Sequence, residues 1–123
     1  MAMRSLVSVV DDDESVRESL PDLLREFGFA VEAFSSAEAF LASKAMAETR
    51  CLILDVSMPG MNGLQLQDEL ARQHRQIPIV FITATRDDSI RPQVIGKGAV
   101  DCLSKPFSET ALLRAVNAAL GKH

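Results

Sequence analysis

The sequence contains no tryptophan and no tyrosine, and only two of its 123 residues are cysteines. Cys51 and Cys102 lie far apart, and neither has a second cysteine or a histidine at metal-ligand spacing. The sequence therefore predicts neither a zinc site nor a disulfide framework. Basic residues are not in excess, since 13 Lys and Arg stand against 17 Asp and Glu, for a net charge of −4. A domain with this charge lacks the basic surface of nucleic-acid-binding proteins, so direct binding to DNA or RNA is not expected.

Long hydrophobic runs are missing as well. The apolar run at residues 6–10 is interrupted by Ser8 and followed at once by three aspartates, so it fits neither a signal peptide nor a membrane span. We therefore expect a cytoplasmic protein without membrane contact. No linker rich in Pro, Gly or Ser divides the chain, and 47% hydrophobic residues suffice for a buried core. The simplest organisation is a single domain over residues 1–123.

Short apolar runs alternate with amphipathic stretches from one end of the chain to the other. Five runs have the length and composition of strands buried on both faces: residues 6–10, 30–34, 51–54, 77–82 and 100–103. Strict alternation with helices predicts parallel strands, right-handed crossovers and helices on both faces of the sheet. The predicted fold class is α/β, a doubly wound, flavodoxin-like, five-stranded parallel sheet with strand order 2-1-3-4-5.

The first two helices carry local signals that a structure can test. The second is predicted to start at Ser35, with Glu38 three residues later completing a capping box. The first helix is predicted to bury one face, on which apolar residues recur with helical spacing: Val16, Leu20, Leu23, Leu24 and Phe27.

Polar side chains gather where four of the predicted strands end. They are Asp11, Asp12 and Asp13 after the first strand, Asp55 after the third, Thr83 after the fourth and Lys105 after the fifth. In such a sheet, ligands bind beyond the carboxyl ends of the strands, at the switch point between the first and third. Carboxylates this close repel one another, and one lysine offsets too little of their charge. An oxygen-only site without His or Cys suits a hard divalent cation such as Mg²⁺.

A carboxylate beside Mg²⁺ and a lysine is also the arrangement that phosphoryl transfer to an aspartate needs. Asp55 would be the nucleophile, and its product would be an acyl phosphate, which hydrolyses readily and suits transient signalling. Taken alone, the acidic run that begins at Asp11 is more often a capped helix start than a metal site. The joint placement of these residues at successive strand ends favours the functional interpretation.

Four segments resemble the receiver domain of two-component response regulators: VVDDDESVRESL at residues 9–20, LILDVSMPGMNG at 52–63, IVFITA at 79–84 and GAVDCLSKPF at 98–107. The segment FSSAEAFL at 34–41 is most similar to the nitrogen-fixation regulator subfamily. Members of that subfamily carry a C-terminal, LuxR-type helix-turn-helix output domain. The resemblance implies that residues 1–123 are the N-terminal domain of a longer regulator of transcription.

The resemblance also implies roles for individual residues. Asp55 would accept a phosphoryl group from the phosphohistidine of a sensor histidine kinase. Mg²⁺ would be held directly by Asp12 and Asp55, through water by Asp11, and by the backbone carbonyl of Ser57. Lys105 would contact Asp55 and the phosphoryl group, and its bond to Pro106 resembles the cis peptide of the family.

The same resemblance implies how the signal would leave the site. Thr83 would move to hydrogen-bond a phosphoryl oxygen, changing the surface of the fourth helix, fifth strand and fifth helix. Besides the kinase, the expected partner is a second copy of the same chain, which would form a homodimer with the first on phosphorylation. Such a domain would not be an enzyme, because it catalyses only its own phosphorylation and dephosphorylation.

The sequence departs from the family pattern at three places. Cys102 stands where the family has an aromatic switch residue, so an aromatic rotamer switch is not available. Pro21 is expected to kink the first helix, because its ring clashes with a carbonyl one turn back. Pro92 falls in the first turn only if the fourth helix starts late, with Ser89 as N-cap. We then expect an extended loop at residues 85–88 and an irregular segment at 85–97 before phosphorylation.

Other functions use similar residues. A Mg²⁺-dependent aspartyl phosphatase would have a second acid two residues after the nucleophile, but Ser57 stands there, and the chain has no cap domain. A receiver-like scaffold that binds a partner without phosphorylation is disfavoured, because such proteins tend to lose acids or the lysine and this sequence retains the whole set. The site residues do not separate a stand-alone receiver that relays phosphate or binds a partner from the receiver of a longer regulator.

Overall fold

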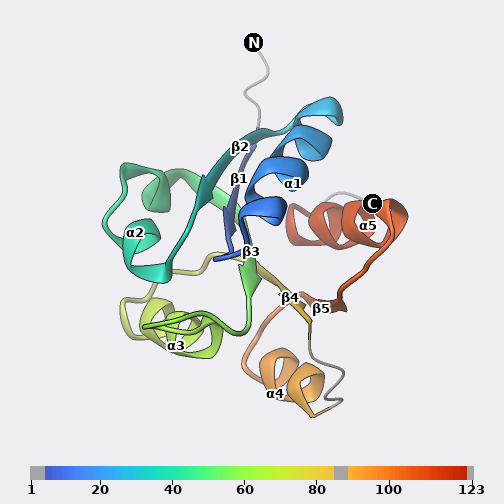
Figure 1. Cartoon of the computed structure of the whole chain (residues 1–123). Coiled ribbons are helices and arrows are strands. Elements are labelled where there is room, and N and C mark those ends of the chain that lie inside the picture. The colour runs from blue at the N-terminus through green and yellow to red at the C-terminus, as the bar shows by residue number, and fades with distance from the viewer. Residues whose placement is uncertain (1–4, 85–88, 122–123) are drawn as a thin grey trace.

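The computed structural model describes residues 5–84 and 89–121, which form one sheet flanked by helices (Figure 1). The strands are β1 (Leu6–Val10), β2 (Ala30–Phe34), β3 (Thr49–Asp55), β4 (Ile79–Thr83) and β5 (Asp101–Ser104). The helices are α1 (Glu14–Glu26), α2 (Ala37–Leu41), the 3-10 helix η1 (Lys44–Glu48), α3 (Gly63–Arg72), α4 (Ile90–Gly96) and α5 (Glu109–Ala119). In the described part of the chain, no helix has both the length and the apolar character of a membrane span.

All neighbouring strands are parallel, and their order is β2-β1-β3-β4-β5, which confirms the predicted fold class and strand order. The bounds of three strands differ from the prediction, and one of them, β5, is shifted by one residue to Asp101–Ser104. Strand β3 begins earlier and includes Asp55 as its last residue. Strand β4 begins at Ile79, because Pro78 has no N–H to donate to the ladder, although its carbonyl accepts a hydrogen bond from the Leu52 N–H (2.9 Å).

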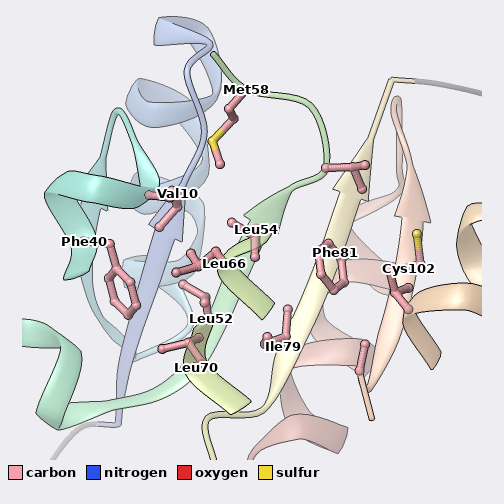
Figure 2. Packing of buried hydrophobic residues seen from close by; sticks show 14 residues of the cluster. Val10, Phe40, Leu52, Leu54, Met58, Leu66, Leu70, Ile79, Phe81 and Cys102 are labelled. Carbon is pink, nitrogen blue, oxygen red and sulfur yellow. The ribbon is translucent and has the colours of Figure 1, made fainter. Parts of the chain in front are cut away.

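Each face of the sheet has its own hydrophobic core. Alternate residues of β3 face opposite ways, so Leu52 and Leu54 pack beneath α2, α3 and α4, while Cys51 and Ile53 pack beneath α1 and α5. Figure 2 shows the first of these cores, with Phe40 and Phe81 among its largest fully buried side chains. The sheet is therefore covered on both faces, which leaves its carboxyl edge as the place for polar side chains.

The start of α2 and the end of α1 each correct a prediction. The N-cap of α2 is Ser36, not Ser35, and its hydroxyl accepts from the Ala39 N–H (3.0 Å). The Glu38 carboxylate does not complete a capping box, because it accepts from the backbone of another loop instead. Phe27 is 46% exposed at the C-cap of α1, since the helix ends before it and its side chain leaves the buried face.

Pro21 and Pro92 lie inside helices that form despite them. Helix α1 runs through the buried Pro21 to Glu26. Helix α4 begins after Ser89 and holds Pro92 in its first turn, as predicted, where the missing N–H costs little. Residues 90–96 are helical rather than irregular, and Val94 anchors them by packing in the core. The expected extended loop at 85–88 lies outside the described residues.

We expect thiol titration of the unfolded protein, without reductant, to find both cysteines. Cys51 and Cys102 are free and belong to cores on opposite faces of the sheet, so they cannot form an intramolecular disulfide without refolding. In the folded protein, burial raises the pKa of the Cys51 thiol to about 12, and its reaction at pH 8 should be slow. Failure to detect free thiols after unfolding would contradict this topology.

Candidate functional site

The three consecutive aspartates after β1 divide into two roles. Asp13 is the N-cap of α1, where its carboxylate accepts from the Ser15 N–H (2.9 Å). Asp11 is fully buried, and its Oδ1 accepts from the Asp13 N–H (2.9 Å). Asp12 is exposed. The helix-start interpretation of the acidic run is therefore correct for Asp13, and the other two carboxylates remain for a site.

Asp55, at the end of β3, brings a third carboxylate to this place. One carboxylate oxygen each from Asp11, Asp12 and Asp55 lies within 4.8 Å of the others. Asp55 is only 6% exposed, and Thr83 at the end of the neighbouring strand β4 is also buried. The parallel register carries these side chains to the same edge, at the switch point between β1 and β3.

Lys105 follows β5 and extends its ammonium group into the carboxylate cluster. Its Nζ donates to Asp11 Oδ2 at 3.0 Å and lies 4.0 Å from Asp55 Oδ2. Its backbone N–H donates to the Thr83 carbonyl (2.8 Å), and the peptide bond to Pro106 is cis, as the family resemblance implied. The lysine thus pairs more closely with Asp11 than with Asp55.

The electrostatics of the cluster follow from burial and crowding. Burial and the neighbouring Asp11 carboxylate raise the pKa of Asp55 to about 7, although Lys105 and the Ser57 N–H act in the opposite direction. Burial lowers the pKa of Lys105, but its hydrogen bond to Asp11 and the charges of the acids outweigh this, so the pKa lies above its usual value. Negative charge on Asp55 is therefore only partly compensated by the chain itself.

The oxygen donors present fit a hard divalent cation. Among the described residues, three carboxylates meet there and no histidine or cysteine joins them, which is the ligand set that Mg²⁺ prefers. Because the negative charge of Asp55 is only partly compensated, a cation bound here would be attracted to it and would stabilise the ionised carboxylate.

The loop between β3 and α3 borders this cluster. The Ser57 N–H points to Asp55 Oδ1 at 3.4 Å, and the Gly63 N–H donates to the Val56 carbonyl (2.9 Å). A Cβ on Gly63 would lie 2.3 Å from the Asp55 carbonyl oxygen, so only glycine allows α3 to start this close to the site. Sequence reasoning did not single out Gly63 or the contact of Glu38 with this loop, because neither depends on local periodicity.

Cys102 lies apart from the carboxylates, in the core beneath α4 (Figure 2). Its side chain packs in the same cluster as Phe81 and Val94, and burial raises the pKa of its thiol. Arg91 of α4 donates to the Cys102 carbonyl (2.9 Å) and to Asp101 Oδ1 (2.5 Å), which joins α4 to β5. At the place of the aromatic switch the protein therefore has a small core side chain and a backbone contact to α4.

Fold and site together define a flavodoxin-like α/β protein with an acidic cluster and a lysine at the switch point of its sheet. The sequence matches the family described as response regulator receiver domain over residues 7–117. The chain therefore belongs to the receiver domain family of two-component response regulators.

Similar proteins include regulators of transcription. The chain is 48% identical over 116 residues to nodulation protein W of Bradyrhizobium diazoefficiens and 46% identical to the response regulator protein TodT of Pseudomonas putida, covering 94% of this chain and 51% of each relative. It is 40% identical to the transcriptional regulatory protein FixJ of Azorhizobium caulinodans, covering 94% and 55%. The chain thus spans about half the length of the curated relatives it matches.

Solved structures agree with the fold. The response regulator StyR is 46% identical with a TM-score of 0.89, covering 97% of this chain and 60% of that one. The structure titled FixJ-N is 37% identical with a TM-score of 0.86, covering 98% and 96%. These similarities agree with the predicted likeness to the nitrogen-fixation regulators, and they concern the receiver domain alone.

Proposed function

We propose that Asp55 accepts a phosphoryl group from a histidine kinase and thereby switches the surface formed by α4, β5 and α5. The observation that carries this proposal is the buried Asp55 carboxylate, beside two further aspartates and 4.0 Å from the Lys105 ammonium. Receiver domains are the family to which the chain belongs, and its relatives include proteins named as transcriptional regulators.

In the proposed reaction, an Asp55 oxygen forms a bond to phosphorus as the bond between phosphorus and the kinase's histidine nitrogen breaks. Asp12, Asp55 and the Ser57 carbonyl would hold Mg²⁺, with Asp11 acting through water. When bound, the ion would supply positive charge against the charge that develops on the phosphoryl oxygens. Lys105 lies beside Asp55 and would contact the same oxygens. Thr83, at the end of the adjacent strand, would donate to a phosphoryl oxygen and pass the change to α4.

The proposal also covers the location of the domain, the protein to which it belongs and its partners. We place the chain in the cytoplasm, as the N-terminal part of a longer regulator with a LuxR-type helix-turn-helix output. The domain itself is proposed not to be an enzyme acting on other substrates and not to bind nucleic acid. Its partners are a sensor histidine kinase and a second copy after phosphorylation. An aspartyl phosphatase is disfavoured because Ser57 offers no carboxyl group to protonate a leaving group.

The proposal is tested by incubating the protein with acetyl phosphate and Mg²⁺ and measuring its intact mass. We expect a mass increase of one phosphoryl group that requires Mg²⁺ and disappears when a chelator is added first. A protein that stays unmodified with both acetyl phosphate and its kinase would refute the proposal.

Mg²⁺ affinity should depend on Asp12 and on pH. Asp12→Ala removes one ligand oxygen and is expected to weaken binding at least about tenfold. The proton that Asp55 holds below about pH 7 must leave before the carboxylate binds the ion, so affinity should rise from pH 6 to pH 8. Calorimetric titration measures both effects, with Asp22→Ala as a control that removes an exposed acid outside the cluster. Equal affinities for wild type and Asp12→Ala would refute the ligand assignment.

A further inference from the structure

The loop at residues 56–62, between β3 and α3, is held at its start by β4 and the core and at its end by α3. At its start, the Val56 N–H donates to the Ile82 carbonyl (3.1 Å), and the Met58 side chain is buried in the core. At its end, Asn62 caps α3 in a reciprocal capping box with Gln65. The middle of the loop contains Gly60, whose φ of +72° is in the left-handed region.

Glu38, from the first turn of α2, contacts the middle of this loop. Its Oε2 accepts from the Met61 N–H at 3.0 Å, across 23 residues of sequence. A Cβ on Gly60 would lie 2.8 Å from the same oxygen, so the glycine leaves room for the carboxylate. The Met61 N–H and the N–H of Glu38 itself hold the pKa of this carboxyl below its usual value, so it is ionised at neutral pH.

Helix α2, which carries Glu38, is anchored by buried side chains and a capped N-terminus. Ala37 and Phe40, on either side of Glu38, are fully buried in the core that also contains Met58. The Ser36 hydroxyl caps the helix through the Ala39 N–H. The carboxylate therefore extends from an anchored helix to a loop that has no regular structure of its own.

The loop at residues 56–62 begins immediately after Asp55, the proposed phosphoacceptor. Ser57, four residues before Met61, has its N–H 3.4 Å from Asp55 Oδ1, and its carbonyl is the proposed backbone ligand of Mg²⁺. Each loop residue that is free to leave its backbone conformation gains entropy, so a loop without its central contact samples more conformations. We expect these conformations to displace the Ser57 carbonyl relative to the Asp55 carboxylate by a small distance, because Val56 and Met58 on either side of it are anchored. A small displacement is enough to slow a reaction that depends on close alignment.

We propose that Glu38 is a positioning residue for phosphorylation, which fixes the loop at residues 56–62 through the Met61 N–H. This inference rests on the proposed function of Asp55. It assigns to Glu38 a role in the reaction although its side chain lies on another helix and touches neither the acidic cluster nor Lys105 in any described contact.

Two substitutions separate the hydrogen bond from the charge. Glu38→Ala removes the acceptor, and Glu38→Gln keeps an acceptor oxygen without the charge. Because Glu38→Ala loses this hydrogen bond, we expect its phosphorylation by acetyl phosphate to be about three- to tenfold slower than in the wild type. Glu38→Gln should stay within about twofold of the wild type on the same reasoning. Glu18→Ala, which removes an exposed helical glutamate from α1, is the matched control and should react at the wild-type rate.

The experiment measures phosphorylation rate at saturating Mg²⁺, Mg²⁺ affinity, and hydrogen exchange of the Met61 amide in all four proteins. We expect faster Met61 exchange, slower phosphorylation and weaker Mg²⁺ binding together in Glu38→Ala, with Glu38→Gln restoring all three. Normal phosphorylation in Glu38→Ala, or equal slowing in Glu38→Gln, would overturn this inference while leaving Asp55 as phosphoacceptor. A wild-type protein that is not phosphorylated would overturn the proposed function and this inference with it.

Discussion

Asp55→Asn is expected to lose the phosphoryl adduct completely while gaining stability above pH 7. The amide has no anionic oxygen to attack phosphorus, so the adduct disappears for a chemical reason. The gain in stability has an electrostatic reason, because the wild-type carboxylate is buried beside Asp11 and asparagine removes the repulsion between them.

The direction of the pH effect follows from the raised pKa of Asp55, about 7 in the folded protein against an ordinary value of 3.8. Between these two values the folded state holds a proton that the unfolded state has released, so wild-type stability falls as pH rises through this window. The asparagine side chain of the variant cannot titrate, so the variant should lack this decline. Allowing for solvent screening, we expect a difference of roughly 1–2 kcal/mol at pH 8 and little difference near pH 4.

Urea unfolding of both proteins at several pH values, with a chelator present to exclude divalent cations, measures this difference. Intact mass after treatment with acetyl phosphate and Mg²⁺ measures the adduct in parallel samples. An adduct in Asp55→Asn would contradict the assigned phosphoacceptor. The same decline in stability with pH in both proteins would contradict the electrostatic account of Asp55.

Gly63→Ala should have the second large effect, on stability and on the site together. The new Cβ would lie 2.3 Å from the Asp55 carbonyl oxygen and 3.0 Å from the Val56 Cα, both of them backbone atoms that cannot rotate away. Either α3 or the end of β3 must shift, at a cost of about 1–3 kcal/mol or more. Because Asp55 carries the reactive carboxylate, the same shift should slow phosphorylation.

Gly96→Ala is the matched control for this prediction. Gly96 ends α4, and nothing lies within 4 Å of a Cβ placed there. Alanine favours the helix over glycine, so this variant should be up to about 1 kcal/mol more stable than the wild type. Urea unfolding measures the free energy of unfolding of both variants. Equal values would contradict the prediction that close packing at Gly63 makes its substitution destabilising.

Strand order and the acidic cluster could be predicted because both follow from the sequence pattern. Buried parallel strands have continuous apolar runs, and the residue after such a run necessarily lies at the carboxyl edge of the sheet. Asp11, Asp55, Thr83 and Lys105 each follow a run in this way, and the structure brings Asp11, Asp55 and Lys105 within contact distance. The role of Asp13 as a helix cap was likewise visible in the sequence as an acidic helix start.

Contacts across the fold were not predictable in the same way. Glu38 has the spacing of a capping box, but its carboxylate accepts from Met61, because folding brings the loop after β3 next to α2. Phe27 fits the apolar period of α1, but the helix ends at Glu26 and Phe27 is 46% exposed. In both cases the local pattern is real, and a tertiary contact or a helix end decides where the side chain goes.

The most direct test of the central claim is to locate the phosphoryl group by chemical reduction. Borohydride converts an aspartyl phosphate to homoserine, which peptide mass spectrometry detects at a single sequence position. After treatment with acetyl phosphate and Mg²⁺, we predict homoserine at position 55, within the peptide that also contains Met58. Homoserine at position 11 or 12 instead, with Asp55 intact, would contradict the account.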